Sequence, residues 1–256
     1  MIDLALLKRL EITCYADFAD VERRPYGLLY HCADNPLSHD SNHGVILDLD
    51  GDLEAAVADV TAFYEGRGLE PRLYASFTAG EAARLRPVLE RCGYTFREMA
   101  QRLFVLRPDA STPGPPPGVH LDVRRVRALS GGVRALVHSD GPAPWTEHAM
   151  RRHLAVEGFH LLVGYARGVP VTMAAIKVMP GLSRVDDVLT HPLHRGRGYA
   201  RALMATLVTY HREVTDQPLY LYAENPVAIR IYEEVGFVEE PLPVDQWTAW
   251  RPLPRR

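Results

Sequence analysis

The stretch Val185–Met204, VDDVLTHPLHRGRGYARALM, carries the strongest local signal in the chain. A β-branched, apolar run ends near Thr190, and a short loop then leads into the glycine-bearing segment RGRGYA, residues 195–200. Beyond this segment, aromatic and leucine side chains recur at the spacing of one helix face: Tyr199, Leu203, Leu207 and Tyr210. The stretch therefore predicts a strand, a tight turn and the start of an amphipathic helix.

This turn has the properties of an anion site. The first turn of a helix presents amide groups without intrahelical partners and about half a positive charge. Gly196 and Gly198 lack a Cβ atom, so a ligand can approach the main chain closely, while Arg195 and Arg197 add positive charge. Phosphate is the anion that best matches such a site. Neither the P-loop spacing nor a complete GxGxxG fingerprint is present.

The segment Pro108–Gly118, PDASTPGPPPG, is the clearest break in the sequence. Its proline and glycine content excludes a regular helix or a strand ladder and is typical of an extended connector. We therefore expect an N-terminal domain over residues 1–107, a linker over 108–118 and a C-terminal domain over 119–256.

The C-terminal part alternates strand and helix patterns, which predicts an α/β fold with a mixed central sheet flanked by helices. Expected strands cover residues 119–126, 159–166, 169–179, 184–190, 219–223 and, as a final edge strand, 247–251. Expected helices cover residues 127–138, 145–156, 199–210 and 226–235.

The N-terminal part repeats the end of this pattern, with strands at 45–49 and 73–75 and helices at 53–64 and 81–92. The segment LERCGY at residues 89–94 also resembles YEEVGF at 232–237. We interpret this as an internal duplication, and a chance likeness of two α/β segments is the alternative.

The glycine-bearing segment resembles motif A of the GCN5-related N-acetyltransferases (GNAT), Arg/Gln-x-x-Gly-x-Gly/Ala, which reads here as residues 195–200. Thr190-x-Pro192 precedes it where that family commonly has Val-x-Pro. Asn225-Pro226-Val227-Ala228, followed by Tyr232 and Gly236-Phe237, resembles the second signature of the family. The resemblance covers residues 119–256 well and the first half weakly. It implies two tandem GNAT-like copies, the N-terminal one degenerate.

In that family the cosubstrate is acetyl-CoA. The resemblance implies that its pyrophosphate binds the motif A turn, that its pantetheine arm pairs with the preceding strand, and that Asn225 and Ala228 contact the arm. The implied cofactor-binding residues are Val188, Leu189, Thr190, Arg195, Gly196, Arg197, Gly198, Tyr199, Ala200, Asn225 and Ala228. The N-terminal copy has the segment DLDGD at residues 48–52 in this place, and its carboxylates would repel a pyrophosphate while capping a helix well.

The resemblance places Tyr232 near the thioester sulfur, where a phenol can protonate the departing thiolate. Asp187 is our candidate for the base that removes a proton from the attacking amine, with Asp186 as its alternative. Many relatives carry a glutamate near the position of Arg184, so this chain departs from the family there.

Several of these residues also fit plain structural roles. Tyr232 fits a core position, Asn225 a helix cap, and Asp186 and Asp187 solvent-facing strand ends. The pairs His191/His194 and His39/His43 have spacings seen in metal sites, but no third ligand accompanies them in the sequence, and we expect no metal.

Composition limits the remaining function classes. The 256 residues carry a formal net charge of −3, which argues against a sequence-independent grip on nucleic acid. No apolar run reaches the roughly 18 residues of a membrane span, and three scattered cysteines favour a reducing, cytoplasmic setting. A homodimer is compatible with the sequence.

We therefore expect an N-acetyltransferase that moves an acetyl group from acetyl-CoA to a primary amine, on a small molecule or a peptide, by direct attack. The alternative from another class is a non-catalytic CoA-binding sensor or scaffold. A hydrolase would require an activated nucleophile, and the sequence shows no motif of a nucleophile and its base.

Overall fold

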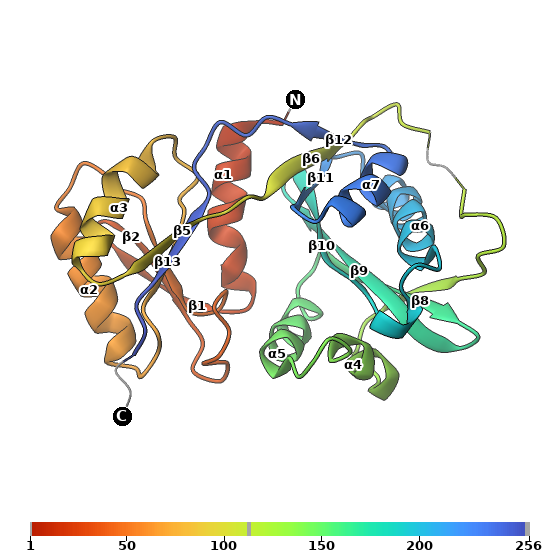
Figure 1. The fold of residues 1–256 in the computed structure, drawn as a ribbon, viewed down its shortest axis with the longest axis horizontal. Coiled ribbons are helices and arrows are strands. Elements are labelled where there is room, and N and C mark those ends of the chain that lie inside the picture. Colours follow the sequence, from red (N-terminus) through yellow and green to blue (C-terminus); the bar gives the residue numbers. More distant parts are fainter. Residues whose placement is uncertain (1, 112–113, 254–256) are drawn as a thin grey trace. The chain divides into compact units, whose positions relative to one another are not determined.

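The computed structural model describes residues 2–111 and 114–253, and it confirms a mixed α/β architecture (Figure 1). The chain divides into two compact units. The C-terminal unit comprises Met1–Leu6 and Gln101–Pro241, and the N-terminal unit comprises Leu7–Ala100 and Leu242–Arg256. Within the described residues, no helix is both long enough and apolar enough to cross a lipid bilayer.

The C-terminal unit contains a seven-stranded mixed sheet of order β12-β6-β11-β10-β9-β8-β7. Its strands are β6 (Arg102–Leu106), β7 (Asp122–Val126), β8 (Phe159–Ala166), β9 (Val169–Met179), β10 (Leu182–Thr190), β11 (Leu219–Ala223) and β12 (Phe237–Glu240). Its helices are α4 (Gly131–Val137), α5 (Pro144–His153), α6 (Tyr199–Val214) and α7 (Pro226–Glu234), with a 3₁₀ turn at Pro192–His194.

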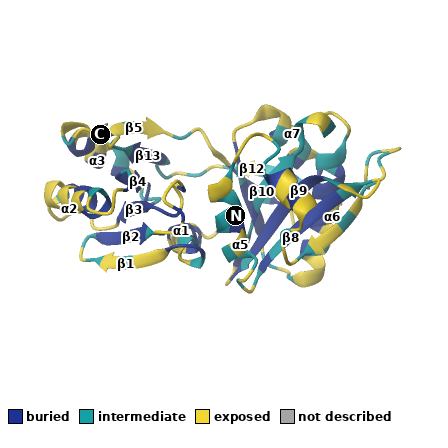
Figure 2. Ribbon diagram, turned by 90° about the horizontal axis from the view of Figure 1, so that it is seen from below, coloured by how far each residue is buried: buried dark blue, intermediate teal, exposed yellow. Residues whose placement is uncertain are grey.

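Alternation along the central strands explains how both faces of this sheet are covered. Ala174 and Ile176 of β9 pack in one core with α6 and α7, whereas Met173 and Ala175 pack in another with α4 and α5. Leu203 and Leu207 of α6 are fully buried, as their spacing predicts. Figure 2 shows the central strands of the sheet buried between partly exposed helices.

The N-terminal unit contains a six-stranded sheet of order β1-β2-β3-β4-β13-β5. Its strands are β1 (Asp20–Arg24), β2 (Gly27–His31), β3 (His43–Ile46), β4 (Arg72–Tyr74), β5 (Thr95–Glu98) and β13 (Trp247–Trp250). Its helical segments are α1 (Leu4–Thr13), a 3₁₀ turn at Cys14–Asp17, α2 (Leu53–Glu65) and α3 (Glu81–Arg91).

The two sheets follow the same plan, which supports the expected duplication. In each, antiparallel strands lead to a parallel pair that is joined through a helix, β3 with β4 and β10 with β11. Each parallel pair has only two registered positions, Gly44↔Leu73 and Val45↔Tyr74 in one, Ser183↔Leu219 and Arg184↔Tyr220 in the other.

The division differs from the one that we expected at the proline-rich linker. β6, which precedes the linker, lies between β11 and β12 in the C-terminal unit. β13, expected as an edge strand of the C-terminal domain, lies instead between β4 and β5 of the N-terminal unit, and that expectation was wrong. Strand pairing is made by main-chain groups, so the sequence of a short strand does not reveal which sheet it joins. Thr112 and Pro113 of the linker lie outside the described residues.

Side chains around Glu81 hold β13 in place. The indole nitrogen of Trp247 donates to Glu81 Oε1 at 3.2 Å, and the indole stacks on Phe96 with ring centroids 5.0 Å apart. The Ser76 amide donates to the same carboxylate at 2.9 Å, and the Ala82 amide donates to Asp245 at 2.8 Å. The last strand is therefore part of the N-terminal core.

Replacing Trp247 should destabilise the protein strongly. Trp247→Ala removes a side chain that is 3% exposed, and such truncations cost about 3–5 kcal/mol of unfolding free energy. The control is Trp145→Ala, because that side chain on α5 is 40% exposed and should cost under about 1 kcal/mol. Urea unfolding followed by far-ultraviolet circular dichroism measures both; equal losses in the two variants would contradict a core role for β13.

His211 of α6 links the stability of the C-terminal unit to pH. The side chain is 2% exposed, and neither ring nitrogen has a hydrogen-bond partner among the described residues. Burial, with the charge of Arg212 adding to it, lowers its pKa from 6.5 to about 4. The unfolded chain therefore binds a proton between about pH 6.5 and 4 that the folded chain does not, so stability falls as the pH drops through this range.

His211→Phe should remove that dependence. This shift of the His211 pKa corresponds to a loss of at most about 3 kcal/mol of unfolding free energy by pH 4. We expect the difference in unfolding free energy between pH 7 and pH 4.5 to be smaller in the variant, by about 2 kcal/mol. His43, whose pKa burial lowers to about 3, contributes equally to both proteins. If the unfolding free energies of wild type and variant fall in parallel as the pH drops, His211 binds its proton equally well in the folded and the unfolded chain, and its pKa is not lowered.

Candidate functional site

A pocket of 690 Å³ in the C-terminal unit collects most of the residues singled out in the sequence. It lies between the end of β10, the start of α6 and one side of α7. Its lining comprises Asp140, Val188, Leu189, Thr190, His194, Arg195, Gly196, Gly198, Tyr199, Ala200, Arg201, Met204, Asn225, Val227, Ala228, Ile231 and Tyr232. Arg197 is exposed and is not among these residues.

The pocket opens where two parallel strands diverge. β10 and β11 are registered only at Ser183↔Leu219 and Arg184↔Tyr220, although β10 continues to Thr190. A bulge against β9 between Asp186 and Leu189 bends β10 at this point, and Asp187 has a φ of +53°. A non-glycine residue in this region of φ is strained and is characteristic of functional sites. The end of β10 is thus left without β11 as its neighbour and forms one wall of the pocket.

The turn before α6 supplies unpaired main-chain donors. The first hydrogen bond of the helix runs from the Ala202 amide to the Gly198 carbonyl, at 3.0 Å. The amides of Tyr199, Ala200 and Arg201 find no acceptor among the described residues, and no side chain caps the helix. These amides and the helix dipole point toward the pocket, which makes this end of α6 suited to an anion.

Both glycines of the turn adopt a left-handed conformation, with φ of 72° at Gly196 and 77° at Gly198. A Cβ atom on Gly198 would also lie 3.0 Å from Cγ2 of Val119, whereas one on Gly196 would meet no atom within 4 Å. Gly196 is therefore required for its backbone conformation, and Gly198 for both conformation and packing.

Arginines border this turn on two sides. Arg195 donates from Nε to the Thr190 carbonyl at 3.1 Å and pairs with the Asp140 carboxylate. Arg201, the third residue of α6, has its Nε 3.1 Å from Glu234 of α7. Each arginine next to the unpaired amides is thus paired with a carboxylate.

Tyr232 of α7 lines the pocket. Its side chain is 7% exposed, and burial raises its pKa to about 12. Among the described residues, no group forms a hydrogen bond with its hydroxyl, and Ala228 and Ile231 line the pocket beside it. A phenol with this pKa is neutral near pH 7 and is able to donate a proton.

Asn225 acts as a helix cap in the structure. Its Oδ1 accepts from the amides of Val227 at 2.9 Å and Ala228 at 3.4 Å, at the start of α7. This leaves the amide nitrogen of Asn225 as the group that a ligand in the pocket could meet.

Neither candidate base lies in the wall of the pocket. Arg184 Nε donates to Asp186 at 2.8 Å, so Asp186 is held in an ion pair. Asp187 occupies the bulge of β10 and is not a lining residue. The assignment of Asp187 as the catalytic base therefore stays a prediction.

The pocket also contains residues that the sequence analysis did not select: Asp140, His194, Arg201, Met204, Val227 and Ile231. Met204 lies four residues after Ala200 on α6, so helix periodicity was an available signal for this residue. Asp140 reaches the pocket from the connection between α4 and α5, and local sequence carries no sign of that contact.

The corresponding helix end in the N-terminal unit is already occupied by carboxylates. Asp48 Oδ1 accepts from the amides of Asp50 at 3.0 Å and Gly51 at 3.2 Å. Asp52 caps α2 by accepting from the Ala55 amide at 2.9 Å. These contacts take up three amides at and just before the start of α2 and surround this helix end with negative charge, which disfavours an anion.

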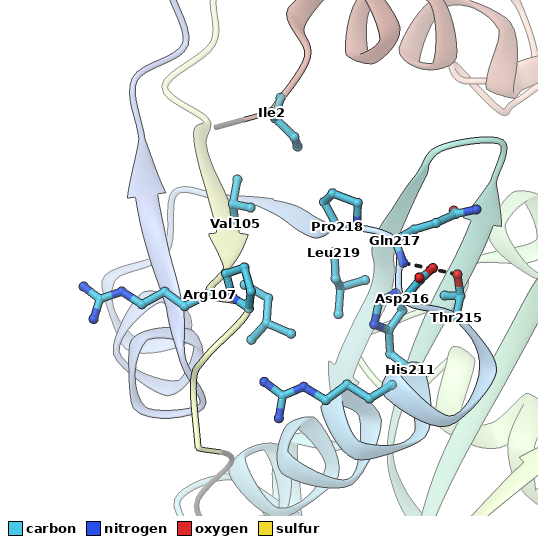
Figure 3. Close-up of a pocket in the computed structure, with 12 residues that line it drawn as sticks. Ile2, Val105, Arg107, His211, Thr215, Asp216, Gln217, Pro218 and Leu219 are labelled. Atoms are coloured by element: carbon cyan, nitrogen blue, oxygen red, sulfur yellow. Dashed lines mark hydrogen bonds between the residues drawn. The ribbon is translucent and has the colours of Figure 1, made fainter.

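A second cavity, of 380 Å³, lies at the other end of β11 (Figure 3). It is bordered by Ile2, Val105, His211 and Leu219, and Figure 3 shows the side chain of Arg107 extending away from His211. No residue predicted for the site lines this cavity. In the described part of the chain, no three side chains of the metal-binding types form a cluster.

Comparisons with known proteins match the segment that contains this pocket. Residues 132–237 match the model of the "Acetyltransferase (GNAT) family". The chain is 39% identical over 57 residues to a spermidine N(1)-acetyltransferase from Vibrio cholerae, covering 21% of this chain and 33% of that protein. It is 31% identical over 136 residues to a mycothiol acetyltransferase from Nocardiopsis dassonvillei, covering 50% of this chain and 36% of that protein. The chain thus spans about a third of the length of these curated relatives.

The fold of nearly the whole chain is similar to that of a solved structure. A GCN5-related N-acetyltransferase from Kribbella flavida superposes with a TM-score of 0.70, at 18% identity, over 99% of this chain and 97% of that one. The matched segment, residues 132–237, contains the diverging strands, the glycine turn and α7. The C-terminal unit of this protein therefore carries a GNAT acetyltransferase family domain.

Proposed function

We propose that the protein transfers an acetyl group from acetyl-CoA to a primary amine by direct attack. The observation that carries this proposal is the row of unpaired amides at residues 199–201, beside a pocket that Tyr232 also lines. A diphosphate fits the first feature, and the diverging strands leave room for an extended arm that leads to the second.

Different residues of the pocket would bind different parts of acetyl-CoA. The pyrophosphate of acetyl-CoA would accept from the amides after Gly198, with Arg195 supplying charge. The pantetheine arm would run along Val188–Thr190, where β10 lacks a β11 neighbour. The free amide nitrogen of Asn225 and the side chain of Ala228 would border the arm from α7.

The chemistry needs a neutral amine and a protonated leaving group. The amine lone pair forms a bond to the acetyl carbonyl carbon, the C–S bond breaks, and the sulfur leaves as a thiolate. Tyr232, neutral at pH 7, would give its proton to that sulfur; a positioned acid contributes roughly 10²–10⁴ in rate. We propose Asp187, at the strained bulge of β10, as the base that takes the proton of the amine.

The names of the relatives support a small-molecule amine as acceptor, since one acts on spermidine and one is a mycothiol acetyltransferase. We propose that the N-terminal unit is a degenerate copy, because the carboxylates of Asp48 and Asp52 lie at the start of its helix α2 and accept from amides there. Cys14, Cys32 and Cys92 are free thiols, which supports a cytoplasmic setting.

The second candidate function is a CoA-binding sensor or scaffold without turnover. It is favoured by one observation: neither Asp186 nor Asp187 lines the pocket. Calorimetry with CoA, followed by thiol release from acetyl-CoA over a panel of amines, separates the two. Binding with amine-dependent thiol release supports the enzyme, binding alone supports the sensor, and no heat with CoA contradicts both.

Tyr232→Phe tests the proton donor. The variant keeps the ring that packs beside Phe237 but loses the hydroxyl, so kcat should fall by about 10²-fold or more while CoA affinity changes little. Tyr210→Phe is the control, because Tyr210 lies on α6 outside the pocket. Its hydroxyl forms a hydrogen bond with Nδ1 of His160 at 2.7 Å. An unchanged kcat in Tyr232→Phe would refute the assignment.

Gly196→Asp tests the anion site. Its side chain would enter open space, so the change adds negative charge beside the amides without a clash. A charge at about 4 Å is worth several kcal/mol near a protein surface, which predicts a loss of CoA affinity of about 100-fold or more. Gly168→Asp is the matched control, since Gly168 also has a positive φ, 79°, and open space. Equal CoA affinity in the two variants would place the pyrophosphate elsewhere.

A further inference from the structure

The guanidinium of Arg195 joins two segments of the pocket wall. Its Nε donates to the carbonyl of Thr190, the last residue of β10, at 3.1 Å. Its Nη2 donates to the carboxylate of Asp140, in the connection between α4 and α5. All three residues line the pocket. A carboxylate therefore neutralises the arginine next to the amides that are suited to a phosphate.

This ion pair is easily broken. The side chains of Arg195 and Asp140 are 54% and 50% exposed, and pairs of this kind contribute under about 1 kcal/mol. A pyrophosphate at the same turn offers Arg195 more charge and a bidentate geometry. It would also repel Asp140. The two anions compete for one guanidinium, and the phosphate has the stronger interaction.

The rest of the Asp140 segment is fixed independently of the phosphate turn. His138, at the end of α4, accepts from the Ala143 amide at 2.9 Å through Nδ1, and its Nε2 lies 2.7 Å from Glu147. Between these anchors, Gly141 has a φ of 128° and no atom within 4 Å of where a Cβ would lie. The bond to Arg195 is thus the contact that ties this connection to the turn, next to a glycine that permits movement.

We infer that Asp140 is a positioning residue that competes with a phosphate for the guanidinium of Arg195. Its carboxylate holds Arg195 at the mouth of the pocket and is displaced when a pyrophosphate binds. Displacement releases the connection between α4 and α5, so that binding of the donor loosens this part of the pocket wall. The inference rests on the proposed function, because it requires a phosphorylated ligand at the turn.

Asp140→Asn tests the competition directly, because asparagine has the same shape and no charge. We expect CoA, and separately inorganic pyrophosphate, to bind about three- to tenfold more tightly than to wild type by calorimetry. Asp122→Asn is the matched control: Asp122 forms an exposed pair with Arg124 on β7, outside the pocket, and its removal should leave both affinities unchanged.

Hydrogen exchange provides a readout that a purely structural role would not change. In wild type, amide exchange over residues 139–141, which lie between the anchors at His138 and Ala143, should accelerate when CoA is added. In Asp140→Asn the same amides should exchange fast without CoA and respond little to it.

The outcomes separate the two proposals. Weaker CoA binding by Asp140→Asn would mean that Asp140 prepares Arg195 for the ligand, and it would overturn this inference alone. If Asp140→Asn changes neither the CoA affinity nor the amide exchange, the ion pair between Asp140 and Arg195 has no role in binding, and this inference alone is overturned. No binding of CoA or pyrophosphate to wild type would overturn the proposed function and this inference together.

Discussion

The C-terminal unit depends on one constraint, the unpaired amides at the start of α6. Main-chain donors that find no partner cost free energy when they are kept from water, so a helix end of this kind must face solvent or a ligand. Here Gly198, at a φ of 77°, ends the turn without a side-chain cap, and the diverging β10 and β11 keep the space in front of the helix open. The glycine turn, the end of β10 and Tyr232 of α7 all line the pocket that this geometry leaves open.

The N-terminal unit shows what the same fold becomes when that constraint is removed. Its parallel strands β3 and β4 have the same two-position register, and its helix α2 begins at the equivalent place. Asp52 caps α2 by accepting from the Ala55 amide, and Asp48 accepts from the Asp50 amide just before the helix, which stabilises the helix start and makes it unfavourable for anions. The difference between the two units therefore lies in a few polar side chains at one helix end, while the strand order is retained.

The sequence predicted what local rules determine. The glycine turn, the face of α6 with Leu203 and Leu207, and the strands before and after this helix were expected and observed, whereas the parallel pairing of these strands was not predicted. Contacts between segments far apart in the sequence could not be predicted from local patterns. Nothing local indicates that Asp140 contacts Arg195, and Asn225 caps α7, the alternative role that its sequence position allowed, while its role at a ligand stays a prediction. Asp187 could be named as a charge near a strand end, but the bulge that strains it arises from pairing with β9.

Each half of the chain contributes a strand to the sheet of the other unit, so the units do not divide at the proline-rich segment. The proline-rich segment is a connector, yet β6 before it completes the sheet of the unit after it. In return, β13 at the end of the chain fills the interior of the other sheet, where Trp247 and Glu81 hold it. Each half of the chain thus lacks a central strand of its own sheet. Interior strands need hydrogen-bonded neighbours on both sides, so neither half has a complete core without the other, although each follows the same repeat.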